Sequence, residues 1–401
     1  MNDLSSQFER RLRQVCAEGL PGSAGFAELL DRLEGADPLA TLGALRVIAE
    51  SDPQLGGRAG RLIEEASLLR PPPAPSTTPI VHPLDYHWRF SPATVDRLLD
   101  RAAELTRPGE TVLFLGTPSL YQMVAERLPD RRCILLDRDS RICDAMPVRA
   151  GGETHVVDLL VDPLPKLGAS CAIGDPPWYP DAIAGFAEAA AGLLRSDATL
   201  LLGFPAPLTR PGVSLERADF IESARRLGFD PLDHEPLALR YETPPFEYAA
   251  MGAAGLLSPP HEWRRGDLLV LQFEGPVTER GRRAGIEEPW AAHQFEQIPI
   301  RVRTSAPASG TELISSIVDG DILPTVSRRT PLRSKAALWT SRNRIFASSD
   351  PRRLARILAS LEAGKAPFSE AEAQVAVRLG ALVTLERREH GLRAEALAPA
   401  A

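Results

Sequence analysis

The sequence predicts an α/β protein whose centre is a doubly wound sheet of the Rossmann type, with a helical bundle before it and a small α+β segment after it. Between residues 82 and 275, five short apolar runs alternate with segments of helical period, which is the pattern of a mostly parallel sheet. Apolar residues recur at helical spacing through the first 70 residues, and the alternation stops beyond residue 275. We therefore expect domains at 1–70, 82–275 and 276–401, with a linker at 71–81.

The composition is typical of a globular protein in water. The 401 residues are 44% hydrophobic and 25% charged, which suits two or three domains with cores of their own. The formal net charge of -7 weighs against a protein that coats duplex DNA, because phosphate contacts need clustered Lys and Arg. The first residues are polar, no long uncharged apolar run is present, and the four cysteines have no metal-like spacing. We expect a cytoplasmic protein that does not enter a membrane.

The first 70 residues predict several short helices. Leu29, Leu30 and Leu33 follow Phe26 at the spacing of one helical face, and glycines punctuate the segment. The run PPPAPSTTPI at residues 71–80 cannot be helical, because proline lacks the backbone donor and fixes its own backbone angle. It predicts an extended linker.

The central segment opens with a helix and three strands. Ser91 and Pro92 make a helix start that is followed by apolar residues at helical period. Residues 111–116 form an apolar strand run that ends in glycine, and a helix is expected at 118–128. The next strand runs, 133–137 and 155–158, each end on an acid.

The remaining elements complete the sheet and the tail. The run 171–174 leads into Asp175, with a helix expected at 181–194, a strand at 199–204 and a helix at 217–227. Strand-like segments around 237–241 and 267–273 are separated by a long Pro- and Gly-rich insertion, which suggests a functional loop. In the tail, 298–303 alternates like an exposed strand, 336–340 and 344–346 could pair as a hairpin, and helices are expected at 354–361 and 369–383. This α+β tail is similar to a winged helix.

Polar residues at the strand ends suggest a small-molecule site. The turn after the first strand holds Gly116 and Thr117, and its backbone N–H groups could approach a ligand. It has one glycine where a dinucleotide fingerprint has several, which disfavours a pyrophosphate, and a tight turn without a ligand explains it equally well. Asp137 ends the second strand 21 residues later, where a carboxylate commonly holds the two hydroxyls of a ribose. Asp158 could reach an adenine amino group, although a solvated turn acid explains it better.

The stretch Asp175-Pro176-Pro177-Trp178 carries the clearest chemical signal. It places a carboxylate and an aromatic ring in a sharp turn after a buried strand. With this DPPW motif, residues 82–275 resemble the class I S-adenosylmethionine-dependent methyltransferases, and among them the adenine amino-methyltransferases. The resemblance implies that Asp175 and the Pro176 carbonyl orient an amino group, that Pro177 fixes the turn and that Trp178 stacks on the acceptor ring. It also implies that Phe90, in Phe90-Ser-Pro-Ala-Thr94, walls the cofactor.

The chemistry accounts for these residue types. A ring-conjugated amino group is a poor nucleophile, and hydrogen bonds to a carboxylate and a carbonyl would aim its lone pair at the methyl sulfonium. The leading hypothesis is a methyltransferase acting on an amino group, such as adenine in nucleic acid, with S-adenosylmethionine as cofactor. Gly116 and Thr117 would hold the amino-acid end of that cofactor.

Two alternatives use the same residues. The chain also resembles aminopropyltransferases that make branched polyamines, which carry a similar Asp-Pro-Pro-aromatic motif and a strand-one turn poor in glycine. There Asp175 would orient the attacking amine of a small molecule, and Tyr179, Glu242, Glu247 and Tyr248 could line its pocket. A Pro-rich loop with surface acids explains the insertion better. The other alternative is a catalytically silent module that binds a protein partner through its N- or C-terminal domain. The seven histidines make no paired ligand spacing, so we infer no metal.

Overall fold

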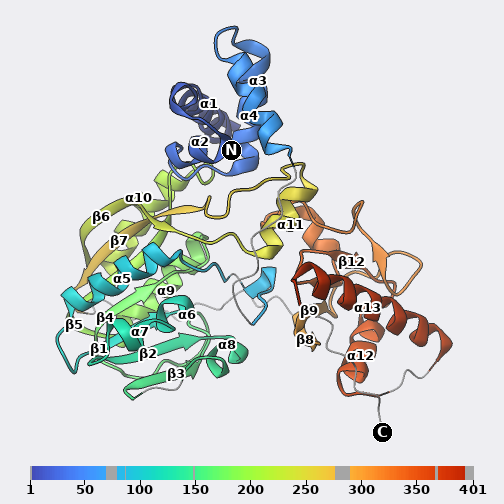
Figure 1. Cartoon of the computed structure of the whole chain (residues 1–401). Coiled ribbons are helices and arrows are strands. Elements are labelled where there is room, and N and C mark those ends of the chain that lie inside the picture. Colours follow the sequence, from blue (N-terminus) through green and yellow to red (C-terminus); the bar gives the residue numbers. More distant parts are fainter. Residues whose placement is uncertain are drawn as a thin grey trace. The chain divides into compact units, whose positions relative to one another are not determined.

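The computed structural model describes residues 2–68, 79–85, 87–147, 150–275, 290–365 and 369–392. The chain divides into two compact units, which Figure 1 colours along the sequence. The first unit draws on residues 1–68, 88–243 and 259–286, and the second on residues 69–87, 244–258 and 287–401. Most of the expected linker at 71–81 lies outside the described residues. Both units are therefore assembled from segments far apart in the sequence.

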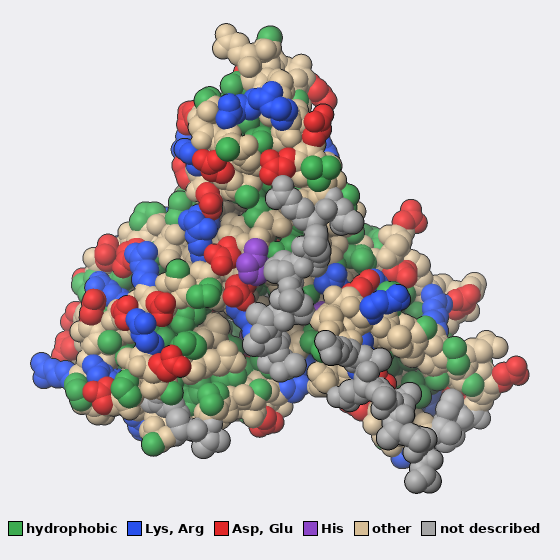
Figure 2. All heavy atoms as spheres, in the orientation of Figure 1, with side chains coloured by type: hydrophobic (Ala, Val, Ile, Leu, Met, Phe, Trp, Pro, Cys, Tyr) green, Lys and Arg blue, Asp and Glu red, His purple; other side chains and the backbone are tan. Residues whose placement is uncertain are grey.

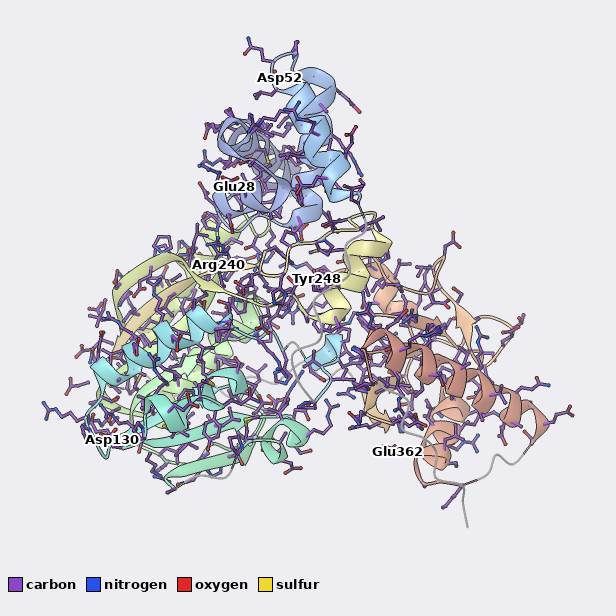
Figure 3. The ribbon with its side chains drawn as sticks, viewed as in Figure 1. Glu28, Asp52, Asp130, Arg240, Tyr248 and Glu362 are labelled. Carbon is purple, nitrogen blue, oxygen red and sulfur yellow. The ribbon has the colours of Figure 1, made fainter. Side chains whose placement is uncertain are left out.

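The first unit begins with short helices, as the glycine punctuation predicts. They are α1 (Asn2–Gly19), the 3-10 turn η1 (Leu20–Gly22), α2 (Phe26–Arg32), α3 (Pro38–Ser51) and α4 (Gly56–Ala66). Asp37 begins α3, because its side chain accepts hydrogen bonds from the N–H groups of Leu39 and Ala40. From α2, Asp31 forms ion pairs with Arg240 at 3.3 Å and with Arg265. Arg240 is labelled in Figure 3. The helices are thus tied to the edge of the sheet that follows.

The centre of the first unit is a seven-stranded sheet in the order β3-β2-β1-β4-β5-β7-β6, parallel except for β7. Its strands are β1 (Thr111–Leu115), β2 (Arg132–Asp137), β3 (Gly152–Val156), β4 (Ala169–Gly174), β5 (Leu194–Pro205), β6 (Phe229–Arg240) and β7 (Arg265–Phe273). One face packs on α5 (Pro92–Leu105), α6 (Pro118–Tyr121), α7 (Val124–Arg127) and α8 (Ser140–Asp144). The other packs on α9 (Pro180–Leu193) and α10 (Val213–Arg226). This doubly wound sheet confirms the predicted fold class.

The element bounds differ from the prediction in several places. The single helix expected at 118–128 is two short helices, α6 and α7, because the chain tightens at Met123 into i to i−3 hydrogen bonds. Strand β3 begins at Gly152 and ends at Val156, before the residues expected to close it. Strand β6 begins at Phe229 rather than near Leu237, and register shifts interrupt its pairing with β7.

The second unit contains a five-stranded sheet in the order β10-β12-β11-β9-β8. Its elements are β8 (Trp290–Phe295), β9 (Ile298–Arg303), β10 (Ser315–Ser316), η3 (Pro331–Lys335), β11 (Leu338–Thr340), β12 (Ile345–Ala347), α11 (Pro245–Ala253), α12 (Pro351–Glu362) and α13 (Glu370–Glu389). The expected hairpin pairs β11 with β12. The hydroxyl of Ser369, where the last helix was expected to begin, accepts a hydrogen bond from the N–H of Glu372 and caps α13. Tyr248 of α11 and Glu362 of α12 are labelled in Figure 3.

The expectation that 298–303 is an exposed strand is wrong. Strand β9 lies between β8 and β11, and its first five residues are buried. Arg301 can be buried because its guanidinium forms an ion pair with Asp85 at 2.7 Å. Residues 79–85 thus contact this sheet, and His82 makes a second hydrogen bond of 3.1 Å to the carbonyl of Trp339.

The described residues contain no helix long and apolar enough to cross a membrane. In the same ranges, no group of three or more His, Cys, Asp and Glu side chains is arranged to hold a metal ion. All four cysteines are buried, and no disulfide joins any two of them. On the face shown in Figure 2, basic and acidic side chains are mixed.

Candidate functional site

The carboxyl ends of β2, β1 and β4 lie side by side. Leu115 at the end of β1 pairs with Leu136 of β2 and with Gly174 of β4. The residues that follow these partners are Gly116, Asp137 and Asp175. In an open α/β sheet this edge is where ligands bind. The register therefore brings three of the sequence-predicted site positions to one edge of the sheet.

The turn after β1 has the properties of a ligand cradle. Gly116 has φ of 62°, a left-handed conformation that favours glycine. A Cβ there would meet only the ring of Phe186, at 3.5 Å. Thr117 follows at the start of α6 and is 2% exposed, yet its hydroxyl makes no hydrogen bond within the described residues. A buried hydroxyl of this kind needs a polar partner.

Asp137 at the end of β2 and Asp158, two residues after β3, have different surroundings. Asp137 is 3% exposed, and its Oδ1 accepts a hydrogen bond of 2.9 Å from the N–H of Asp139. The carboxylate of Asp158 accepts from the N–H of Leu160 at 2.9 Å, within its own turn. Asp137 is therefore held at the edge beside Gly116, whereas Asp158 also stabilises a local turn.

Asp175, which follows the central strand β4, is held by a residue that follows the edge strand β6. The hydroxyl of Tyr241, which follows β6, donates a 2.8 Å hydrogen bond to Asp175 Oδ1. Glycine at position 203 of β5 leaves room for this carboxylate, since a Cβ there would collide with Oδ1. Burial raises the pKa of Asp175 to about 7, opposed by the Tyr241 hydrogen bond, the charge of Arg264 and a hydrogen bond from Trp178. Burial and the adjacent carboxylate also raise the pKa of Tyr241, which therefore stays a donor.

Phe90 packs against Tyr241 and pairs with its backbone. The two residues form an isolated antiparallel bridge, and their ring centroids are 4.9 Å apart. The next residue, Ser91, donates its N–H to the carbonyl of Arg240 at 2.9 Å. The segment predicted to wall a cofactor thus also positions the tyrosine that binds Asp175.

An aromatic cage surrounds a guanidinium beside this pair. The guanidinium carbon of Arg264 lies 4.1 Å from the ring centroid of Trp88, 3.9 Å from that of Trp178 and 6.0 Å from that of Tyr241. Trp178 is 6% exposed, and a Cβ at Gly266 would lie 2.8 Å from its ring. Arg264 therefore covers the face of the ring that the sequence predicted to stack on an acceptor.

Several site residues lie in parts of the sequence that no motif links to Asp175. Tyr241 and Arg264 flank the insertion between β6 and β7, and only the tertiary fold brings them to Asp175. The sequence feature that points to them is the long Pro- and Gly-rich insertion between them, which suggests a functional loop. Of the insertion residues proposed to line a pocket, Glu242 belongs to the first unit, whereas Glu247 and Tyr248 lie on α11 of the second.

Comparison with known proteins identifies the fold. No protein-family model and no curated protein matches the sequence. A solved structure of the branched-chain polyamine synthase from Thermus thermophilus is 17% identical, with a TM-score of 0.52 over 71% of this chain and 95% of that one. A TehB-like SAM-dependent methyltransferase from Corynebacterium glutamicum is 15% identical, with a TM-score of 0.30 over 45% of this chain and 87% of that one. The chain shares a Rossmann-like fold with the polyamine synthase, and likeness at this identity shows the fold alone.

Proposed function

We propose that the protein is a transferase that moves an alkyl group from an S-adenosyl sulfonium compound to an amine, and that aminopropyl transfer to a polyamine-like amine suits the site best. One observation carries this proposal. Asp175 combines a Tyr241 hydrogen bond, a pKa of about 7 and an adjoining aromatic cage that already holds a cation. A carboxylate with that pKa can accept a proton near neutral pH, and the cage suits a cationic acceptor.

The cofactor half of the proposed site is the edge formed by β1, β2 and β3. The buried hydroxyl of Thr117 and the left-handed turn at Gly116 would receive the chain attached to the sulfonium. Asp137 would accept hydrogen bonds from the ribose hydroxyls, Asp158 would face the adenine amino group, and Phe90 would wall the site. The Thr117 hydroxyl can accept a hydrogen bond from the amino end of that chain, and a carboxylate can accept from ribose hydroxyls. When bound, the sulfonium supplies the electrophilic carbon and departs as a neutral thioether.

The acceptor half of the site performs the proton transfer. An amine attacks as a neutral nucleophile, and after its nitrogen forms the new C–N bond it must lose a proton. Asp175 accepts that proton on its carboxylate, with Tyr241 fixing the orientation of Oδ1. The Pro176 carbonyl is a second acceptor for the N–H groups, and Pro177 fixes the turn that presents it. Positioning and electrostatics supply the rate enhancement.

Two further observations support the aminopropyl reaction. The formal net charge of -7 favours the approach of a cationic acceptor over a polyanion. The polyamine synthase with the same fold was solved with N4-aminopropylspermidine and 5'-methylthioadenosine. That complex concerns the other protein, and it supports the proposal through the shared fold.

N-methylation is the second candidate, with S-adenosylmethionine as cofactor and an amino group such as that of adenine in nucleic acid as acceptor. The turn Asp175-Pro-Pro-Trp178 at the end of β4 favours it, because it places a carboxylate, a carbonyl and a ring together. The position of Arg264 over Trp178 disfavours it, since a neutral base that displaced the guanidinium would stack on the ring but would not replace its charge beside Asp175.

A donor-by-acceptor experiment separates the two candidates. The purified chain is incubated with decarboxylated S-adenosylmethionine and spermidine, or with S-adenosylmethionine and an adenine-containing oligonucleotide, and products are identified by mass spectrometry. We expect spermidine to gain one aminopropyl group, and Asp175→Asn to abolish this product. Asp219→Asn is the matched control, because that acid is exposed on α10. Methylated oligonucleotide without an aminopropyl product would favour the second candidate, and no product from either pair would refute both.

A further inference from the structure

We propose that Trp88, Trp178 and Tyr241 form the subsite for a positively charged nitrogen of the acceptor, and that Arg264 fills this subsite in the free protein as an internal competitor. This inference rests on the proposed function and deepens it. It names the ligand class of the cage, an alkylammonium ion, and it identifies Arg264 as a residue that sets acceptor specificity.

The geometry of the cage is that of a cation site. The guanidinium lies between two indole rings, at 4.1 and 3.9 Å from their centroids, and the Tyr241 ring is 6.0 Å away. All three rings are within the range in which a cation is attracted to an aromatic face. Trp88 is held in turn by edge contacts with Tyr241 at 6.5 Å and with Trp263 at 6.0 Å. The cage is therefore preorganised by aromatic packing, independently of the cation inside it.

The cage and Asp175 form one recognition element. Tyr241 contributes its ring to the cage and its hydroxyl to Asp175, so the cation and the carboxylate share a wall. The charge of Arg264 acts on Asp175 directly, because it lowers the pKa that burial raises. An alkylammonium ion in the same place would likewise interact with the aromatic rings and with the carboxylate. A neutral ring would replace only the first.

The side chain of Arg264 can leave while the backbone stays in place. Its carbonyl accepts a 3.2 Å hydrogen bond from the N–H of Tyr241, and its neighbour Arg265 begins β7 and pairs with Asp31. These contacts fix the chain on both sides of the cage. The Arg264 side chain itself is partly exposed, which gives it a route to solvent. A rotation about its own bonds therefore empties the subsite without a change of fold.

The energetic consequence is a competition between two cations for one cage. Spermidine binding to the free protein must displace the guanidinium, so its measured affinity is reduced by the stability of the internal contact. Replacing Arg264 by an apolar residue of similar length removes the internal cation and should therefore raise the affinity for spermidine. We expect Arg264→Met to lower the dissociation constant of spermidine by about threefold to thirtyfold, from the usual strength of cation–π contacts.

The test is spermidine titration of the cofactor-free protein, followed by tryptophan fluorescence and calorimetry. Arg264→Lys retains a cation and should bind spermidine as weakly as the wild type. Arg226→Met, at an exposed position on α10, controls for the loss of a positive charge elsewhere. Adding Trp88→Leu to Arg264→Met should abolish the gain. Equal affinity in the wild type and Arg264→Met, or equally tight binding by Arg264→Lys and Arg264→Met, would overturn the inference.

A parallel titration with 5'-methylthioadenosine separates this inference from the proposed function. If all variants bind 5'-methylthioadenosine but Arg264→Met gains no affinity for spermidine, the cage assignment is overturned and the transferase proposal stands. If Arg264→Met gains affinity for spermidine but no variant binds 5'-methylthioadenosine, the cation subsite is supported and the transferase proposal fails. Far-ultraviolet circular dichroism of each variant establishes that the comparison is between folded proteins.

Discussion

Replacing Tyr241 by Phe tests the role of the Asp175 carboxylate most sharply. The substitution removes the hydroxyl that donates a 2.8 Å hydrogen bond to Asp175 and keeps the ring that packs on Phe90. Burial raises the pKa of Asp175, and the hydrogen bond from this hydroxyl lowers it. The resulting pKa is about 7. Without it, the ionised carboxylate loses stabilisation and its pKa must rise further.

The magnitude follows from the strength of the lost contact. A hydrogen bond to a charged group contributes about 1.5–3 kcal/mol, and one pKa unit corresponds to about 1.36 kcal/mol. The pKa of Asp175 should therefore rise from about 7 by roughly one to two units. At pH 7 the ionised fraction falls from about one half to between about one tenth and one hundredth. The rate should fall about fivefold to fiftyfold at pH 7 and recover as the pH is raised.

The assay is the pH dependence of kcat/KM for aminopropyl transfer, measured for the wild type and for Tyr241→Phe. The wild type should lose activity as the pH falls through about 7, because the carboxylate must be ionised to accept a proton. In Tyr241→Phe the same inflection should move to higher pH. A loss of activity that is equal at every pH would refute the reasoning, because a purely structural defect does not move the inflection. An inflection that moves to lower pH would also refute it.

Three other predictions follow from the same contacts. Asp137→Ala should weaken binding of 5'-methylthioadenosine more than tenfold in calorimetry, because a buried carboxylate at the end of β2 is lost; unchanged affinity would exclude it as the ribose ligand. Gly203→Ala should reduce transfer at least tenfold while 5'-methylthioadenosine binding is retained, since the new methyl group displaces the Asp175 carboxylate and not the cofactor edge; full activity would contradict this placement. Asp175→Asn should raise the melting temperature at pH 8 by roughly 4 °C but not at pH 4. The native pKa of Asp175 is raised, so in the wild type its burial costs stability that grows as pH rises from about 4 to about 7 and then levels off; an equal effect at both pH values would argue against a raised pKa.

The sequence predicts the parallel half of the sheet well because its strands are buried on both faces. Strands β1, β2 and β4 each contain an apolar run, and each run leads to a residue expected in the site, Gly116, Asp137 or Asp175. Such runs are read directly from hydrophobicity. The alternation of strands and helices then fixes their order closely enough to place those residues at one edge.

The long antiparallel strand β6 was not predicted over its full length, for a physical reason. It contains two prolines and a bulge in which Leu237 has φ of 54°, and most of the strand is not buried. The carboxylate of Asp267, on β7, accepts a 2.9 Å hydrogen bond from the N–H of Leu237 and another from His234 at 2.9 Å. A partner 30 residues away thus stabilises a conformation that local propensity disfavours. The same strand delivers Tyr241 to the site.

The acceptor half of the site shows a similar limit. Asp175 and Trp178 are adjacent in sequence, and their motif could be recognised. Trp88, Tyr241 and Arg264 are separated by long stretches of chain and share no motif. The packing of aromatic rings around a cation depends on tertiary contacts, as does the burial of Arg301 by its ion pair with Asp85. Neither the aromatic cage nor this ion pair produces a periodic pattern in the sequence.

The most direct test of the central claim is the stoichiometry of one reaction. The purified chain is supplied with decarboxylated S-adenosylmethionine and spermidine, and mass spectrometry quantifies aminopropylated spermidine and 5'-methylthioadenosine together. We predict that the two products appear in equal amounts and that Asp175→Asn forms neither. Formation of 5'-methylthioadenosine without the polyamine product, or an undiminished yield of both products from Asp175→Asn, would contradict an amine-directed transfer at this aspartate.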